Sequence, residues 1–422
     1  MTDAENEAEQ HRLRRTTLHL ILSVAAVGLF ALAFVGIYVS TSGRDEPPVP
    51  DPSPSPSQTV APPPAARETL LLQATTAVGA VGNLLSGVAP ADASGAPPAA
   101  AILPLPSDLI VSAPSVAPQP LSRTVATIDT LRPASTVAAT LGVRVDASWR
   151  MDRKALAGLV DSVGGLPVSV PEPLRLRDEE GETVLRLKAG RTRLTGTDAS
   201  WFAVGSARDD TTQTVTDRFT TVMLATLRRL PTTDVAIRES LTALGALAPS
   251  TIGTQDLADY LLELSTVVRA GDAVVEELPA AQISFGGTSA AWLDYAGATP
   301  RLRSLLPYAQ WQAGVDGPAR VLVSAPEGSA DSLAGVRVAI TAAGLVFVDG
   351  RATPVEPAAR TRVTSRGDAA LAKQITTALA TPRATTTVVP AIPVRGRPWA
   401  DADVALSTRY RAPSDATPTL EP

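Results

Sequence analysis

The 422-residue chain has no cysteine and only two histidines, His11 and His19, both near its N-terminus. Without cysteine the fold cannot rely on disulfides, and thiol chemistry is excluded. No histidine follows His19, so the rest of the chain cannot hold a Ser-His-Asp triad or a zinc site of the usual His and Cys type. Any chemistry there must use carboxylates, arginines, hydroxyls and a hard cation.

The chain also lacks an excess of positive charge. It has 37 Lys and Arg against 42 Asp and Glu, a formal net charge of -5. This balance gives no broad attraction to nucleic acid, and we expect no nucleic-acid partner. Apolar residues make up 45% of the sequence, which is enough to build the cores of two or three domains.

One long apolar run, Leu20 to Val39, is present near the N-terminus. Its length of about 20 residues is enough to cross a hydrocarbon core of roughly 30 Å as a helix. Arg12, Arg14 and Arg15 precede the run and acidic residues follow it, which places the N-terminus in the cytoplasm and the bulk of the chain outside. A cleaved signal peptide is the alternative, but no small-x-small site follows closely. We therefore expect a single-pass anchor in the cytoplasmic membrane.

Proline is dense between residues 47 and 66, which predicts an extended spacer. Further on, strand and helix patterns predict an α/β fold with a central sheet flanked by helices. After residue 318 these patterns form two β-α-β halves, which predict a small C-terminal α/β domain. The expected organisation is a cytoplasmic tail at 1–15, a transmembrane helix at 16–40, a Pro-rich linker at 41–66, an extracytoplasmic domain at 67–315, a C-terminal domain at 316–412 and a disordered tail at 413–422.

The block from Leu141 to Leu230 is the most informative part of the sequence. Val143 to Trp149 alternates apolar and polar residues, as a half-buried strand does, and Asp152 is placed to cap the helix that follows. Gly164 and Gly165 then end that helix, and a Val-Pro stretch follows.

This order of strand, helix, Gly-Gly and Val-Pro resembles the core of the LytR-CpsA-Psr family. Members are extracytoplasmic enzymes that move glycopolymers from a polyprenyl pyrophosphate carrier onto peptidoglycan. The C-terminal pattern is similar to the LytR C-terminal domain of many actinobacterial members. The resemblance implies a membrane protein of cell wall organization whose partners are polyprenyl (pyro)phosphate lipid and peptidoglycan or another wall polymer, with Mg²⁺ as its cofactor.

Family motifs point to two candidate catalytic residues. The family stretch Ser-Ile-Pro-Arg-Asp is similar to the segment that ends in Ser107 and Asp108, so the acid is kept while the Arg position carries Ser107. In the family motif Arg-x-x-Arg-Gln, the second Arg matches Arg218. The resemblance therefore implies catalytic roles for Asp108 and Arg218, and helix caps or surface ion pairs are the structural alternative.

Several charged family positions carry uncharged residues in this chain. Val204, Ser206 and Val215 stand where the family has Arg, Phe219 stands at the Gln position, and an early Asp that helps to hold the cation falls near Val81. A diphosphate at such a site would lose charge-assisted hydrogen bonds of about 1.5 to 3 kcal/mol each.

Three charged residues close to these positions are candidates for substrate binding: Arg208, Asp209 and Asp210. They would compensate for the missing cations if their loop turned them inward. A solvated loop is the alternative reading, and two adjacent acids do not by themselves identify a metal site, so no metal ligand is assigned.

Two functions remain open. The missing cations favour a divergent, non-catalytic protein that binds polyprenyl-linked intermediates or wall partners. The alternative is an active Mg²⁺-dependent phosphotransferase that moves a glycopolymer from polyprenyl pyrophosphate to peptidoglycan. A transcriptional regulator, which an older family name suggests, does not suit a domain outside the membrane.

Overall fold

The computed structural model describes residues 69–89, 99–113, 116–125, 131–285, 287–314, 317–325, 330–349, 360–381, 384–389 and 400–410. Within these ranges, no helix has the length and apolar character that a membrane crossing needs. The predicted cytoplasmic tail, transmembrane helix and Pro-rich linker fall outside the described residues, as does the predicted tail at 413–422. Those expectations therefore stay predictions.

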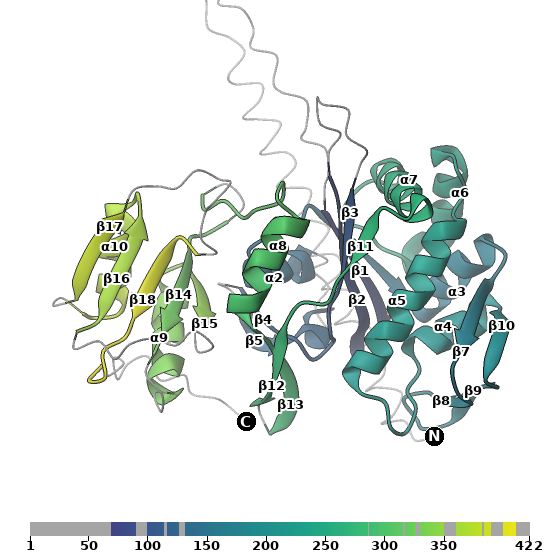
Figure 1. Cartoon of the computed structure of the whole chain (residues 1–422), viewed down its shortest axis with the longest axis horizontal. Helices are drawn as coiled ribbons and strands as arrows, with labels where there is room; N and C mark the ends of the chain where they lie inside the picture. Colours follow the sequence, from purple (N-terminus) through teal and green to yellow (C-terminus); the bar gives the residue numbers. More distant parts are fainter. Residues whose placement is uncertain are drawn as a thin grey trace, which may run out of the picture. The chain divides into compact units, whose positions relative to one another are not determined.

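A mixed five-stranded sheet forms the centre of the larger α/β part (Figure 1). β1 pairs antiparallel with β2 and parallel with β6, and β3 lies between β2 and β11. Residues Leu70 to Leu72 of β1 are all at most 1% exposed, because this strand is covered on both faces. In sheet order, the strands are β11 (Ala273–Val275), β3 (Ala100–Pro104), β2 (Gly79–Val88), β1 (Thr69–Thr76) and β6 (Ala147–Asp152).

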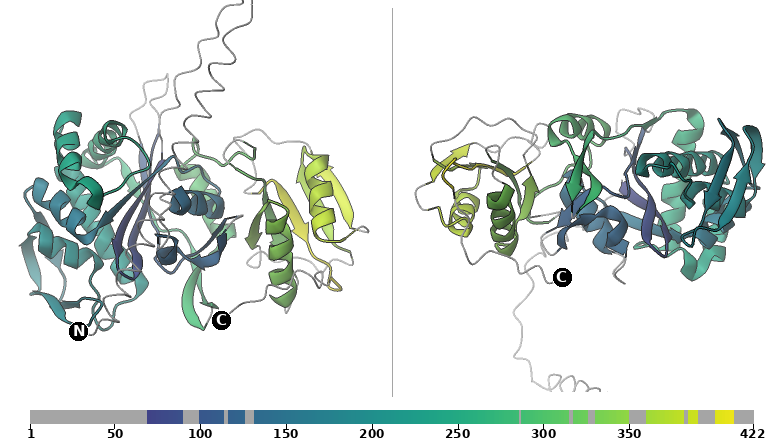
Figure 2. Two further views of the ribbon diagram at one scale, coloured as in Figure 1. Left: turned by 180° about the vertical axis from the view of Figure 1, so that it is seen from behind. Right: turned by 90° about the horizontal axis from the view of Figure 1, so that it is seen from below.

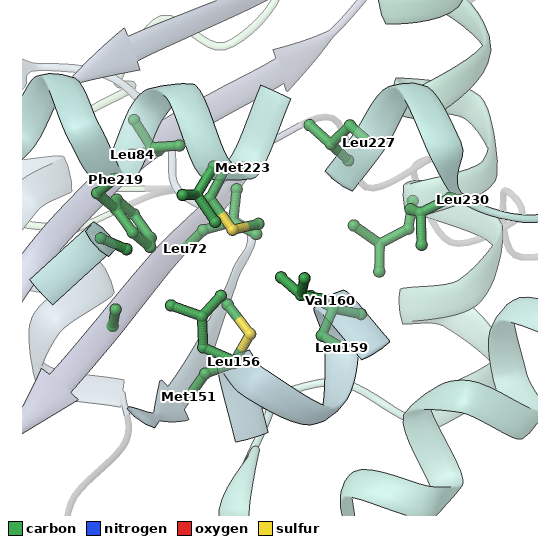
Figure 3. Packing of buried hydrophobic residues seen from close by; sticks show 14 of the residues in the cluster. Leu72, Leu84, Met151, Leu156, Leu159, Val160, Phe219, Met223, Leu227 and Leu230 are labelled. Carbon is green, nitrogen blue, oxygen red and sulfur yellow. The ribbon is translucent and has the colours of Figure 1, made fainter. Parts of the chain in front are cut away.

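Four helices cover one face of this sheet, and a fifth packs against two of them. Leu72 and Leu84 from the strands pack there against Leu156, Phe219 and Met223 from the helices (Figure 3). The helices are α3 (Arg153–Ser162), α4 (Gly196–Val204), α5 (Thr212–Arg229), α6 (Asp234–Leu244) and α7 (Thr254–Ala270). Beside them lie two small sheets, β7 (Leu166–Val170) with β10 (Gly190–Leu194), and β8 (Leu174–Arg177) with β9 (Thr183–Leu187).

The opposite face of the sheet has its own apolar cluster. Leu71 and Leu85 point to this side, because successive side chains of a strand alternate between the faces. The covering elements are the short 3-10 helix η1 (Leu121–Val125), α2 (Leu131–Leu141), α8 (Tyr295–Leu305), the hairpin of β4 (Ile110–Ala113) and β5 (Val116–Pro120), and the hairpin of β12 (Ala280–Phe285) and β13 (Thr288–Leu293). The expected central sheet flanked by helices is confirmed.

The C-terminal part contains the two predicted β-α-β units. β14 and β15 are parallel, as are β16 and β17, and β18 joins the two pairs between β14 and β16. Helices α9 and α10 contact each other and pack on one apolar cluster with the strands (Figure 2). The elements are β14 (Arg320–Ser324), α9 (Ala330–Ala342), β15 (Val346–Asp349), β16 (Arg362–Arg366), α10 (Ala369–Ala378), β17 (Thr385–Val389) and β18 (Ala402–Ala405).

Candidate functional site

A pocket of about 270 Å³ opens where the β1–β2 turn, the end of β8 and the α4–α5 loop meet. We call it the α4–α5 pocket. Its lining includes Val81, Ser107, Val204, Ser206 and Val215. These are the positions at which the family motifs place charged residues, and they come from distant parts of the sequence. The structure therefore brings the uncharged replacements together at a single pocket.

The conformation of the α4–α5 loop follows from its end residues. Thr195 caps the start of α4, and the Thr211 side chain accepts a hydrogen bond from the Thr214 amide at the start of α5. α4 ends at Gly205, where the backbone leaves no room for a side chain. A Cβ there would lie 2.7 Å from the Trp201 carbonyl oxygen. The short loop between these ends holds Ser206 and Asp210 against the pocket.

Arg218 of α5 is buried behind this loop, with only 6% of its surface exposed. Its Nη1 and Nη2 donate to Oδ1 and Oδ2 of Asp210 at 2.9 and 2.7 Å. Its Nε donates to the Phe202 carbonyl at 2.8 Å, and Nη2 also donates to the Gly205 carbonyl at 2.6 Å. All three guanidinium nitrogens thus donate to oxygens of the protein itself, and these bonds hold the loop in place.

Asp210 lines the pocket, but its carboxylate is already paired. Burial by itself would raise the pKa of this carboxyl. The hydrogen bonds from Arg218 and from the Ala207 amide, together with the Arg218 charge, outweigh burial and lower the pKa. Asp210 therefore stays ionised as the partner of Arg218, which leaves it little capacity to bind a substrate.

Asp108 lies beside the pocket, in the turn after β3, next to the lining residue Ser107. It is half-buried, and its Oδ1 is shielded from solvent with no hydrogen-bond partner. Burial raises the pKa of this carboxyl, and hydrogen bonds from its own backbone and from the Thr212 side chain only partly oppose that rise. Asp108 thus has the perturbed environment that is typical of functional acids.

Arg208 and Asp209 do not join Asp108 or Arg218. Both are exposed in the α4–α5 loop, and neither makes an ion pair with any described residue. Of the three predicted binding residues, only Asp210 lines the pocket.

Two further lining residues, Arg177 and Trp201, were missed by the sequence analysis. Arg177 is the cation among the residues that line the pocket, and its Nη1 donates to the Gly181 carbonyl at 3.2 Å. Trp201 of α4 carries the guanidinium of Arg153 over its ring at 4.0 Å from the centroid. The Leu-Arg-Leu-Arg alternation of β8 is the sequence signal that places Arg177 on the exposed face of its hairpin.

The residues at the pocket do not fit the Mg²⁺ site that the resemblance implies. Among the described residues, no three His, Cys, Asp or Glu side chains gather as a cation site. Val81 has no oxygen to offer at the family's acidic position, and the Asp210 oxygens accept from Arg218 and the Ala207 amide. Use of Mg²⁺ therefore stays a prediction, and we derive no chemical step from it.

Part of the chain around this pocket is similar to known proteins. Residues 130–227 match the model of the LytR_cpsA_psr family. No curated protein matches the sequence.

Similar solved structures include a LytR-Csp2A-Psr enzyme from Actinomyces oris, with 23% identity over 59% of this chain and 94% of that chain and a TM-score of 0.46. TagV from B. subtilis has 15% identity over 57% of this chain and 98% of that chain, with a TM-score of 0.48. TagT bound to LIIa-WTA has 15% identity over 59% and 93% of the two chains, with a TM-score of 0.44. The family model spans α2 through most of α5, the elements that carry the diagnostic block and Arg218, and it supports the assignment of this part of the chain to the LytR-CpsA-Psr family.

Proposed function

We propose that this chain is a membrane-anchored protein of the cell envelope that acts in the attachment of glycopolymers to the cell wall. Within that process we assign it the role of a non-catalytic binder of polyprenyl-linked intermediates or wall partners. The match of residues 130–227 to the family model supports the envelope role. The apolar run from Leu20 to Val39 supports a single span, with the N-terminus in the cytoplasm and the bulk of the chain outside.

The composition of the α4–α5 pocket is the observation that carries the non-catalytic assignment. Ser107, Val204, Ser206 and Val215 line it where the family motifs have Arg. Each absent guanidinium removes a charge-assisted hydrogen bond of about 1.5 to 3 kcal/mol to a diphosphate. The retained Arg218 is paired with Asp210 and does not compensate.

The remaining charges around the pocket also disfavour a tightly held diphosphate. Asp178 and Glu179 line it together with Arg177, so the acidic side chains there outnumber the cationic ones. Transition-state stabilisation in phosphoryl transfer depends mainly on cations placed around the phosphate oxygens. A pocket of this composition suits weak binding better than catalysis.

The alternative, an active phosphotransferase, has one specific observation in its favour. Asp108 is retained from the family motif, and burial raises its pKa. A raised pKa is typical of a carboxyl that acts as a general base.

A transfer assay separates the two functions. Full-length chain in detergent is incubated with Mg²⁺, a polyprenyl diphosphate saccharide and peptidoglycan, and products are followed by mass spectrometry. We expect lipid binding without transfer. Transfer that Asp108→Asn abolishes, and that the exposed control Asp209→Asn leaves intact, would show that the chain is an enzyme.

Restoring a lost charge tests whether this pocket is where the lipid diphosphate binds. Ser206 is exposed and lines the pocket, so Ser206→Arg can be accommodated there. We expect it to tighten binding of the polyprenyl diphosphate saccharide, whereas Thr197→Arg, which adds the same charge on the exposed face of α4, leaves affinity unchanged. Equal affinities for the two variants would place lipid binding elsewhere.

A further inference from the structure

A second pocket, of about 430 Å³, lies between the β1–β2 turn, η1, the end of β6 and the short 3-10 helix η2 (Gly245–Leu247). We call it the Arg150 pocket. Its charged lining residues are Arg123, Arg150 and Asp152. Cations therefore outnumber acids here, whereas acids outnumber the cation at the α4–α5 pocket.

The two arginines come from different elements, and both keep donors for a ligand. Arg150 alternates with Trp149 and Met151 along β6, so its side chain lies on the face of the sheet that η1 covers. Its Nη1 donates to the Val125 carbonyl at the end of η1, at a long 3.5 Å. Within the described part of the chain, this is the one bond of the Arg150 guanidinium, and that of Arg123 has none. Such a guanidinium can donate to both oxygens of an anion.

Asp152 does not neutralise this pair of cations. Its Oδ1 accepts a hydrogen bond from the Ala155 amide at 2.7 Å as the cap of α3. Among the described residues it forms no ion pair with either arginine. Two guanidinium groups against one carboxylate give the lining a net charge of +1. That charge is balanced by a singly charged anion.

The walls of the pocket are held in place by the backbone. The Arg150 amide donates to the Pro249 carbonyl at 3.0 Å, which fixes the segment after η2 against β6. Gly79 has φ +128°, and a Cβ there would overlap the Ser122 carbonyl oxygen, so the β1–β2 turn packs directly on η1. Fixed walls lower the entropic cost of binding.

Apolar side chains lie next to the two cations. Val78 in the β1–β2 turn is 67% exposed and Leu247 of η2 is 46% exposed. Both line the Arg150 pocket, together with Val125 and Ala246. Exposed apolar side chains beside polar groups are typical of ligand sites. The pocket therefore fits an anion that also carries a small apolar group.

We propose that the Arg150 pocket binds a singly charged oxyanion, a carboxylate or a phosphodiester, that carries a small apolar group. Arg123 and Arg150 donate to its oxygens, while Val78 and Leu247 contact the apolar group. The assignment depends on the charges of this pocket and holds whether or not the α4–α5 pocket binds a lipid diphosphate.

Ligand-detected NMR tests the proposal on full-length protein in detergent, at low ionic strength because salt screens exposed charges. The probes are N-acetylalanine, a carboxylate beside a methyl group, and dimethyl phosphate, a phosphodiester. The uncharged N-acetylalaninamide is the matched control. We expect saturable binding of at least one anion and none of the amide, and the tighter anion identifies the charged group. If neither anion binds, or if the amide binds as tightly as the anions, the proposal is overturned.

Arginine variants locate the bound anion. Arg150→Gln removes a guanidinium with little loss of bulk, and we expect it to weaken binding of the anionic probe about ten-fold. Arg175→Gln removes the same charge at an exposed position of β8 outside the pocket and keeps wild-type affinity. Equal affinities of these two variants would refute the site.

Asp152→Asn tests the charge balance by a gain of affinity, which loss of fold cannot produce. Asn caps a helix as well as Asp does, so the start of α3 is kept. The variant removes the acid of the lining, and we expect about three-fold tighter binding of the anionic probe. The control Asp209→Asn, in the exposed α4–α5 loop, leaves affinity unchanged. Unchanged or weaker binding in Asp152→Asn would contradict the role of the net positive charge.

Discussion

Arg218 and Asp210 form a bidentate ion pair, with Nη1 to Oδ1 at 2.9 Å and Nη2 to Oδ2 at 2.7 Å. The same guanidinium donates to the carbonyls of Phe202 and Gly205, so a single side chain of α5 holds both the end of α4 and the loop that follows it. The cation that matches the family motif thus has a structural function in this chain.

Replacing Arg218 is expected to destabilise the fold. Arg218→Ala leaves the Asp210 charge unpaired in a site where both side chains are less than 10% exposed. Breaking a buried pair in this way costs about 3 to 5 kcal/mol. Denaturant unfolding followed by tryptophan fluorescence measures the loss, and the exposed control Arg208→Ala should change the free energy of unfolding by less than about 0.5 kcal/mol. If Arg218→Ala were as stable as Arg208→Ala, the ion pair would not hold the loop.

Asp108 should make stability depend on pH. Its folded pKa is raised above the ordinary value of 3.8, so the folded chain binds this proton more tightly than the unfolded chain. Stability therefore falls as the pH rises from the ordinary pKa through the raised one, and the penalty is complete above it. We expect Asp108→Asn to be more stable than wild type at neutral pH and to lose that gain below the ordinary pKa. Urea unfolding over a pH series checks this, with Asp209→Asn as the exposed control. A difference in stability between Asp108→Asn and wild type that does not change with pH would contradict the prediction.

Local patterns were sufficient to predict much of the architecture. Asp152 caps α3 as expected, with its Oδ1 accepting from the Ala155 amide at 2.7 Å. The alternation of Val143 to Trp149 predicts a strand, and β6 occupies the second half of that stretch. Such features depend on nearest neighbours in the sequence, and the chemistry of a cap or a pleat is local.

The states of the charged groups could not be predicted in the same way. The pairing of Arg218 with Asp210 depends on how the α4–α5 loop turns, which no periodicity encodes. The surroundings of Trp149 were equally out of reach of local patterns, because this residue pairs with Ser250, about 100 residues away in the sequence. Val204, Val215 and Ser107, which the family motifs mark in distant parts of the sequence, line one pocket, because a family resemblance carries long-range information.

Gly82 of β2 lies directly against the ring of Phe219 of α5. A Cβ at Gly82 would lie 2.4 Å from Phe219 Cγ, and Phe219 is fully buried. Gly82→Ala is therefore expected to overpack this core and to cost about 1 to 3 kcal/mol. Because Phe219→Leu removes the ring, the double variant should lose less stability than the sum of the single losses. A double-mutant cycle from chemical denaturation measures this coupling, and strict additivity would show that the ring does not limit the approach of the strand.

Arg320, the first residue of β14, ties this strand to the end of α2. The side chain is 1% exposed, its Nε donates to the Ala139 carbonyl at 2.9 Å, and Nη2 donates to the Thr140 carbonyl at 3.0 Å. Arg320→Met keeps the aliphatic bulk but removes both bonds, at an expected cost of about 1 to 3 kcal/mol for each carbonyl left unpaired. Denaturant unfolding of the full chain measures the loss against Arg362→Met, the same change at an exposed position of β16. Because that control removes no buried hydrogen bond, equal stability of the two variants would mean that the Arg320 bonds add nothing to the fold.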